Sequence, residues 1–237
     1  MSGSFHYLQY GSKRIEYLLL SSARKTLEIA VHPDSSVVVK APSSSELAAV
    51  ELKLRKRARW ILKQLRYFQQ FVPRTPERRY ISGETHLYLG RRYQLKVVKG
   101  ELNKVKLARG AFIVSYRNDC DQKKTMALME NWYSQKALQH FNNSFIRCWV
   151  SFERYGVERP DLKIRRMKNR WGSLSNGSSI ILNPELIKAP SECIDYVVTH
   201  ELCHLLFNDH SRDFYNLLGS VMPNWERIKR KLEFTMA

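Results

Sequence analysis

The segment His200-Glu201-Leu202-Cys203-His204 places two histidines and an acid within an apolar stretch, and it constrains this chain more than any other feature. Residues four apart on a helix lie one turn apart on the same face, so His200 and His204 can bind one metal ion. Glu201 is rotated by about 100° from His200, which makes it a general base beside a metal-bound water rather than a ligand. The apolar neighbours predict a buried helix; they are Ile194, Val197, Val198, Leu202, Leu205 and Leu206.

A third histidine follows at His210. Catalytic zinc sites usually have three protein ligands and one open position, so His210 is the candidate third ligand. If the helix continued, six further residues would rotate His210 by about 600° and point it away from the pair. Asn208 and Asp209 readily leave helical geometry. We therefore expect the helix to begin near Pro190 and to break between Phe207 and Asp209, so that the chain turns back to the metal.

Five short segments are close to a known family pattern: 166–173 (Arg-Met-Lys-Asn-Arg-Trp-Gly-Ser), 181–183, 193–198, 200–204, and 208–211 with Phe214. Together they resemble the YgjP-like metallopeptidases, which are related to the SprT-like and WLM zincins. The strong resemblance spans residues 165 to 233. Two positions depart from the family pattern. The family commonly has Cys where this chain has Leu174, and it often has Asn where this chain has Asp209. A metzincin is a poorer match because metzincins have glycine where this chain has Phe207.

The resemblance implies a zinc-dependent peptidase with Glu201 as general base and His200, His204 and His210 as ligands. It also suggests that strand 178–182, just before the metal helix, is an edge strand that holds an extended peptide through Ile180, Ile181 and Leu182. The alternative is an ordinary sheet strand. Trp171 and Gly172 are expected to shape the cleft, with the alternative that Trp171 is a packing residue. The oxyanion donor stays open among Tyr196, Tyr215 and the arginines.

Two other functions fit the same residues. One is a basic nucleic-acid-associated protein with a structural metal, although structural zinc sites are typically closed and cysteine-rich and do not need an acid such as Glu201. The other is a zinc hydrolase of a non-peptide ester or amide, because an activated water is not specific to peptide bonds.

The remaining pattern predicts an α+β fold. Short apolar runs at 14–20, 25–31 and 37–40 read as an antiparallel meander, broken at His32-Pro33-Asp34. A helix is expected from Ser43, which forms an S-x-x-E capping box with Glu46, to about Phe71, with Pro73 and Pro76 beyond it. Strands follow at 87–89, 93–98, 104–107 and 111–116.

Apolar side chains then recur at helical spacing from Met126 to about Phe152, which predicts a long helix whose stripe packs in the core. The chain is thus expected to have a β-rich N-terminal half with one long helix, followed by a mainly helical zincin-like half with a short edge strand beside the metal helix. We place the boundary between residues 1–120 and 121–237, with the alternative that both parts share one core. No internal sequence repeat is visible.

The chain is strongly basic, with 40 Lys and Arg against 22 Asp and Glu and a net charge of +18. Clusters at 53–66 and 163–170 predict possible DNA or RNA contact, with Arg55, Arg59, Arg166 and Lys168 as candidate residues. The alternative is a solvated charged face. No nucleic-acid-reading motif accompanies the clusters.

No secretory signal and no run of about 20 apolar residues is present, so we expect no membrane association. The cysteines Cys120, Cys148, Cys193 and Cys203 are scattered without C-x-x-C pairing, which favours reduced thiols and a cytoplasmic location. The oligomeric state cannot be predicted from these features.

Overall fold

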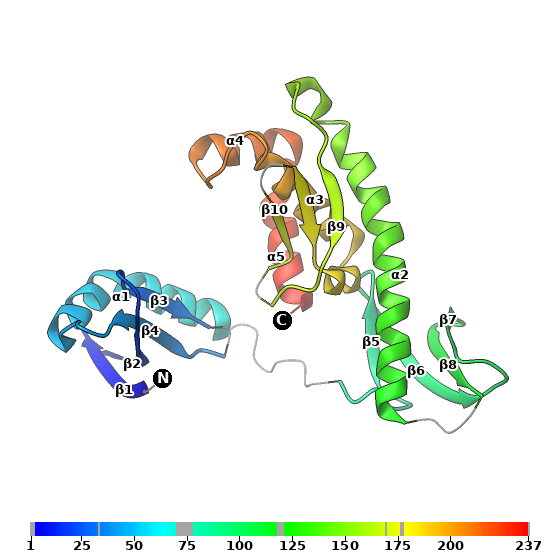
Figure 1. Ribbon diagram of the computed structural model, residues 1–237, viewed down its shortest axis with the longest axis horizontal. Coiled ribbons are helices and arrows are strands. Elements are labelled where there is room, and N and C mark those ends of the chain that lie inside the picture. The colour runs from blue at the N-terminus through cyan, green and yellow to red at the C-terminus, as the bar shows by residue number, and fades with distance from the viewer. Residues whose placement is uncertain are drawn as a thin grey trace. The chain divides into compact units, whose positions relative to one another are not determined.

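The computed structural model describes residues 3–32, 34–69, 78–117, 121–168, 170–175 and 178–236. The chain divides into two compact units, an N-terminal unit (Met1–Thr75) and a C-terminal unit (Pro76–Ala237). Figure 1 labels their helices and strands. Each unit has its own cluster of buried apolar side chains.

The N-terminal unit is a four-stranded sheet covered by one helix. Its strands are β1 (Gly3–Tyr10), β2 (Lys13–Ser22), β3 (Glu28–Val31) and β4 (Val37–Pro42), in the order β1-β2-β4-β3. The predicted meander is wrong, because β2 pairs in parallel with β4 and β3 lies at the edge. β1 was not predicted, since exposed polar and aromatic side chains alternate along most of it.

Helix α1 (Leu47–Gln69) packs its apolar stripe on this sheet through Val50, Leu54, Ala58 and Ile61. It begins four residues later than the predicted capping box. The amide of Val50 donates to the carbonyl oxygen of Glu46, whereas the Ser43 hydroxyl donates to the carbonyl oxygen of Ser22. The predicted helix end at Phe71 and the prolines Pro33, Pro73 and Pro76 lie outside the described residues.

The C-terminal unit begins with a second four-stranded sheet of β5 (Thr85–Tyr88), β6 (Arg91–Lys99), β7 (Lys104–Ala108) and β8 (Ala111–Tyr116). Its order is β5-β6-β8-β7, with β6 and β8 parallel. This is the strand order of the N-terminal sheet, and in both cases a long helix follows. The two halves of the β-rich region therefore share a topology that no sequence repeat reveals.

Helix α2 (Gln122–Trp149) connects this sheet to the rest of the unit (Figure 1). Asp121 caps it, since its side chain accepts from the amide of Lys124 at 2.6 Å. The predicted stripe is buried from Met129 onward, at Met129, Tyr133, Ala137, Phe141, Phe145 and Trp149, whereas Met126 at its start is exposed. Its two ends contact different partners, because Tyr133 donates to the Leu87 carbonyl of β5 while Ser144 donates to Asp195 near the metal-binding motif.

Beyond α2, the 3-10 helix η1 (Glu153–Tyr155) leads to a three-stranded sheet of β9 (Asp161–Ile164), β10 (Gly172–Ser175) and β11 (Ser179–Leu182), in the order β10-β11-β9. The 3-10 helix η2 (Pro184–Lys188) follows and leads to α3 (Ser191–Cys203), α4 (Arg212–Val221) and α5 (Trp225–Met236). Strand β9 contacts α2, and β10 and β11 contact α3. None of the described helices combines the length and the apolarity that a membrane span requires.

One buried cluster joins β5 to β8 with α2 and α3 to α5. The turn between β5 and β6 contacts the start of α3, because Gly90 donates to the carbonyl oxygen of Lys188 and a Cβ at Gly90 would lie 2.5 Å from Pro190. The predicted boundary at residue 120 therefore falls inside the C-terminal unit, and residues 118–120 themselves are outside the described residues.

Asn183 fixes the segment that leads into β10. Its side chain is buried and donates to the carbonyl oxygens of Met167 at 2.7 Å and Arg170 at 3.0 Å, while its own oxygen accepts from the amide of Glu185. Loss of the amide side chain would remove all three of these hydrogen bonds from a buried position.

We therefore predict that Asn183→Ala lowers the free energy of unfolding by about 2–4 kcal/mol, measured by urea titration. Asn142→Ala, on the exposed face of α2, serves as a control and should change it by less than about 0.5 kcal/mol. Equal effects of both substitutions would show that Asn183 does not hold this segment.

Candidate metal site and cleft

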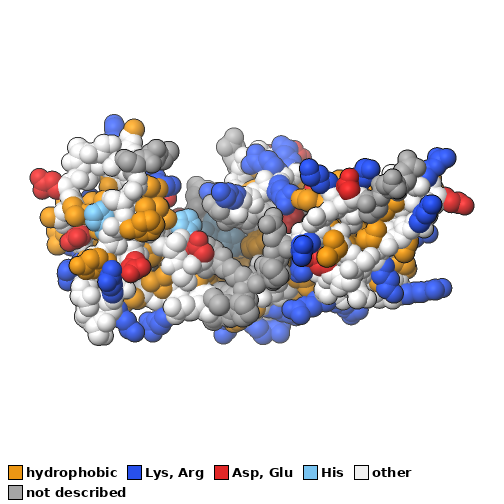
Figure 2. Space-filling view, turned by 90° about the horizontal axis from the view of Figure 1, so that it is seen from below, with side chains coloured by type: hydrophobic (Ala, Val, Ile, Leu, Met, Phe, Trp, Pro, Cys, Tyr) orange, Lys and Arg blue, Asp and Glu red, His pale blue; other side chains and the backbone are white. Residues whose placement is uncertain are grey.

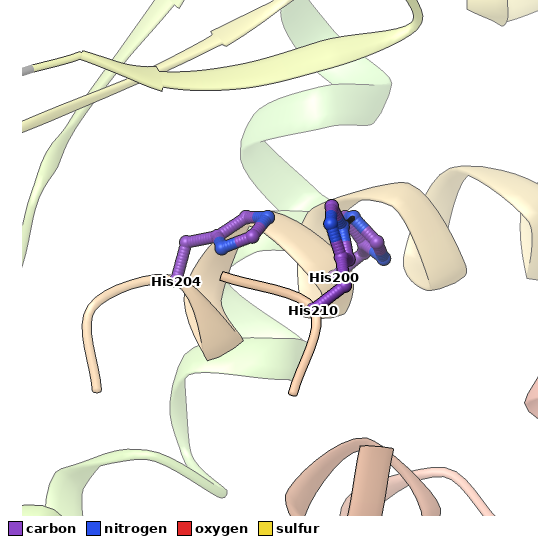
Figure 3. Close-up of side chains that lie close together, drawn as sticks. All are labelled: His200, His204 and His210. Atoms are coloured by element: carbon purple, nitrogen blue, oxygen red, sulfur yellow. Dashed lines mark hydrogen bonds between the residues drawn. The ribbon is translucent and has the colours of Figure 1, made fainter. Parts of the chain in front are cut away.

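Three histidine side chains meet where α3 ends. His200 lies in the last turn of α3, His204 is its C-cap, and His210 comes from the following segment, just before α4. One ligand atom of each lies within 4.8 Å of the others. Figure 3 shows the three rings on the same side of the helix, with those of His200 and His210 side by side. The predicted break thus occurs at Cys203, slightly earlier than the expected Phe207.

The chain turns because α3 ends in a tight series of hydrogen bonds. The amides of His204, Leu205 and Leu206 each donate to the carbonyl three residues earlier, and Ser211 then caps α4 by accepting from the amide of Phe214. Phe214 is buried, and its ring lies 4.7 to 5.0 Å from the three imidazole rings. Phe214 therefore forms an apolar base under the histidine cluster.

The arrangement of nitrogen atoms fits a metal ion. His204 Nδ1 lies 2.9 Å from the carbonyl oxygen of Phe207 and can donate to it, which leaves the Nε2 lone pair free for a metal. The Nε2 atoms of His200 and His210 face each other at 3.0 Å. A hydrogen bond from the other ring nitrogen to a backbone carbonyl, as His204 makes to Phe207, is the usual way in which proteins orient a ligating imidazole. The Nδ1 atom of His200 is buried and has no hydrogen-bond partner among the described residues.

Burial and neighbouring charges oppose protonation of His200 and His210. The pKa of His200 is lowered to about 3, chiefly by burial and in addition by the neighbouring imidazoles of His204 and His210. The pKa of His210 is also lowered, first by desolvation and then by His204. Neutral imidazoles are the form that binds metals, so His200 and His210 are kept in their ligating state at neutral pH.

Glu201 is buried between α3 and β10, 6% exposed. The backbone of β10 approaches it so closely that a Cβ at Gly172 would lie 2.7 Å from Glu201 Oε1 and 2.9 Å from Val197 Cγ1. Burial raises the pKa of Glu201 to about 7, while a hydrogen bond from the amide of Leu174 and the charge of Arg170 act in the opposite direction. Glu201 is thus a carboxyl group whose position depends on a glycine in the adjacent strand.

These residues border an open cleft of about 620 Å³. Its lining comprises Arg170, Gly172, Ser173, Leu174, His200, Glu201, His204, Asn208 and His210. Sequence reasoning had identified the histidines, Glu201 and Gly172, but not Arg170, Ser173, Leu174 or Asn208 as cleft residues. Only the Trp-Gly-Ser segment gave a signal for β10, because β10 is a four-residue strand with no alternating apolar pattern.

The prediction that strand 178–182 is the edge strand is wrong. It forms β11, which pairs with β10 on one side and β9 on the other, so its backbone offers no free hydrogen-bonding edge. Ile180, Ile181 and Leu182 are buried core residues. The edge strand beside the metal helix is β10. Trp171 is partly buried and lies outside the 620 Å³ cleft, but it lines a pocket of about 210 Å³ that shares Gly172, His200 and Glu201 with that cleft.

The predicted nucleic-acid residues occur in both units. Arg55 and Arg59 are exposed on α1, and Arg166 and Lys168 are exposed in the segment between β9 and β10. Arg166 forms ion pairs with Glu130 at 3.1 Å and Glu185 at 3.8 Å. Lys and Arg side chains are visible over both units on the face shown in Figure 2.

Other histidines have structural partners. His86 is buried and contacts Glu84 at 3.1 Å, and His140 contacts the hydroxyl of Tyr88 at 2.9 Å. His32 lies in a backbone turn with Ser35 and Ser36, as predicted. Among the described residues, only His200, His204 and His210 form a group of three or more potential metal ligands.

The model of the YgjP-like metallopeptidase domain matches residues 25–234. The chain therefore belongs to the YgjP-like family of metallopeptidases, as the sequence resemblance indicated. Comparison with curated proteins finds no significant match.

Two solved structures show limited similarity. The metallopeptidase zymogen abylysin of Pyrococcus abyssi is 26% identical, with 38% of this chain and 87% of that chain covered and a TM-score of 0.33. The metallopeptidase zymogen jannalysin of Methanocaldococcus jannaschii is 20% identical, with 41% and 90% covered and a TM-score of 0.36. Scores this low carry no structural argument, so the family assignment depends on the family model.

The close contact between β10 and α3 gives a direct prediction. Gly172→Ala must push Glu201 or β10 away, so it should lower the free energy of unfolding by about 1–3 kcal/mol in a urea titration. Ser173→Ala removes a side chain from the opposite face of the same strand and should have an effect below about 0.5 kcal/mol. A Gly172→Ala protein as stable as the parent would contradict the close approach.

Proposed function

We propose that this protein is a zinc-dependent peptidase in which His200, His204 and His210 hold the metal and Glu201 is the general base. The observation that carries the proposal is the convergence of three imidazoles next to a buried carboxylate at one open cleft. Three nitrogen ligands and an open side match the pattern of catalytic zinc sites rather than of structural ones, which are closed.

A zinc ion bound there would polarise a substrate carbonyl and lower the pKa of water. The protein's own residues supply the proton transfers. Glu201 faces the cleft and would accept a proton as a water oxygen attacks the peptide carbonyl carbon. It would then return that proton to the amide nitrogen as the carbon–nitrogen bond breaks, which yields a carboxylate and an amine.

Strand β10 is the proposed binding site for the peptide backbone. In an antiparallel ladder, alternate residues face the partner strand. The carbonyl oxygen of Trp171 accepts from Asn183 on the β11 side, so Gly172 and Leu174 face away from β11. The amide of Leu174 bonds to Glu201. The amide of Gly172 and the carbonyl oxygens of Gly172 and Leu174 are therefore available to pair with an extended peptide. Pairing through the backbone would hold a peptide with little preference for its side chains.

The free cysteines support the proposed cytoplasmic location. Cys148, Cys193 and Cys203 are free thiols, and Cys193 and Cys203 are fully buried. Burial raises the pKa of Cys193 to about 11 and that of Cys203 to about 12, so both stay protonated thiols and form little of the thiolate that oxidation requires. Buried free thiols of this kind are typical of proteins in a reducing compartment.

The metal ligands can be tested one by one. Purified protein should contain about one zinc ion per chain, and His200→Ala, His204→Ala and His210→Ala should each reduce that content strongly, because three ligands share the binding energy. Zinc is measured by inductively coupled plasma mass spectrometry. His32→Ala, an exposed turn residue, is the control and should keep full occupancy. Normal zinc content in His210→Ala would rule out the three-histidine site.

Glu201 is tested separately from metal binding. Glu201→Gln keeps the size of the side chain but removes the base, so we expect near-normal zinc content and a fall in peptide hydrolysis of about 10²-fold or more. The assay follows cleavage of unfolded protein and, in parallel, of a simple ester. Loss of zinc in this variant would identify Glu201 as a ligand. Cleavage of the ester alone would favour the alternative of a non-peptide hydrolase.

A further inference from the structure

The N-terminal unit contains a groove that the peptidase site does not involve. It has a volume of about 520 Å³ and lies between α1 and the segment around β3. Its lining consists of Lys25, Thr26, Leu27, Ile29, Lys53, Lys56, Arg57 and Trp60. Four of these eight side chains are cationic and none is acidic.

The groove follows one side of α1. Lys53, Arg57 and Trp60 are spaced by four and three residues, and Lys56 adjoins them, so all four project along neighbouring rows of the helix. Arg55 is rotated by about 200° from Lys53 and lies on the other side. The groove therefore involves only the cations on one side of α1, and not all the basic residues of this helix.

The cations of α1 have no ion-pair partner within the part of the chain that the structure describes. Helix α1 has seven Lys and Arg residues and one acid, Glu51. None of the seven has an ion pair among the described residues, whereas Arg147, Arg166, Lys188 and Lys231 in the C-terminal unit each pair with a carboxylate. Near the groove, the Glu28 carboxylate is already occupied by Arg24 and Lys40. An unpaired row of cations creates a positive potential that an anionic polymer can satisfy.

Trp60 adds a second type of contact. Its side chain is 40% exposed although it belongs to a helix whose apolar face is buried by the sheet. An indole ring surrounded by Lys and Arg is the combination with which proteins bind single-stranded nucleic acid, since bases stack on the ring while cations contact the phosphates.

We propose that this groove binds single-stranded RNA or DNA without strong sequence preference. A membrane surface fits less well, because the apolar stripe of α1 is already buried against β1 to β4 and cannot insert into lipid. An acidic peptide would satisfy the cations but would leave the ring of Trp60 without a stacking partner. This proposal does not depend on the peptidase activity.

Binding is tested with the full-length protein and a fluorescently labelled mixed-sequence oligonucleotide of about 16 nucleotides, the upper range of site sizes for single-strand binding folds. Four phosphate contacts predict a slope of about −3 in a plot of log affinity against log salt, so affinity should fall about fiftyfold between 50 and 200 mM salt. Lys53→Gln with Arg57→Gln should reduce this slope by about half. Trp60→Ala should weaken binding at least about fivefold, and Trp60→Phe should restore much of it.

The matched control is Arg55→Gln with Arg59→Gln, which removes the same charge from the same helix outside the groove and should retain the parental slope. If both double variants weakened oligonucleotide binding equally, the proposal of binding in the groove would be overturned in favour of a diffuse charged surface. Equal binding of polyglutamate or of phosphatidylserine vesicles, with no effect of Trp60→Ala, would also overturn the proposal. Circular dichroism checks that each variant is folded. If Trp60→Ala is not folded, Trp60→Phe, which keeps an aromatic ring, still tests stacking.

Discussion

The structure of the C-terminal unit depends on the burial of α3, a helix that carries ionisable groups at its end. A buried carboxylate or imidazole without a partner costs free energy. Contacts with α2, α5, β10 and β11 cover the helix, and only the last turn reaches the cleft. Desolvation there keeps His200 neutral and raises the pKa of Glu201.

Several contacts hold α3 in this position. Asp195 accepts hydrogen bonds from Ser144 and Arg147 of α2. Glu192, at the start of α3, binds Lys231 of α5 at 2.5 Å. On the cleft side, β10 approaches closely because residue 172 is a glycine, and Asn183 holds the segment before it. The cleft is thus built by a rigid helix and a short strand rather than by loops alone.

The sequence predicts well whatever is encoded locally. The helical spacing of His200 and His204, the turn before His210, the aromatic stripe of α2 and the strands β5 to β8 are all found in the structure. Features that depend on distant pairing were predicted less well. The family resemblance suggested that β11 was an edge strand. The segments of β9 and β10 are too short for a local pattern to show that they pair with β11 on both sides. The parallel pairing of β2 with β4, and the strand order that both four-stranded sheets share, are also long-range properties.

The central claim is that His200, His204 and His210 hold one zinc ion and that Glu201 lies beside it without binding it. The most direct measurement is a crystal structure of the zinc-loaded protein with anomalous diffraction recorded on both sides of the zinc absorption edge. We predict one anomalous peak at about 2.0–2.1 Å from a nitrogen of each histidine, with the Glu201 carboxylate outside bonding distance. A peak at other residues, or one in which Glu201 replaces His210 as a ligand, would contradict this account.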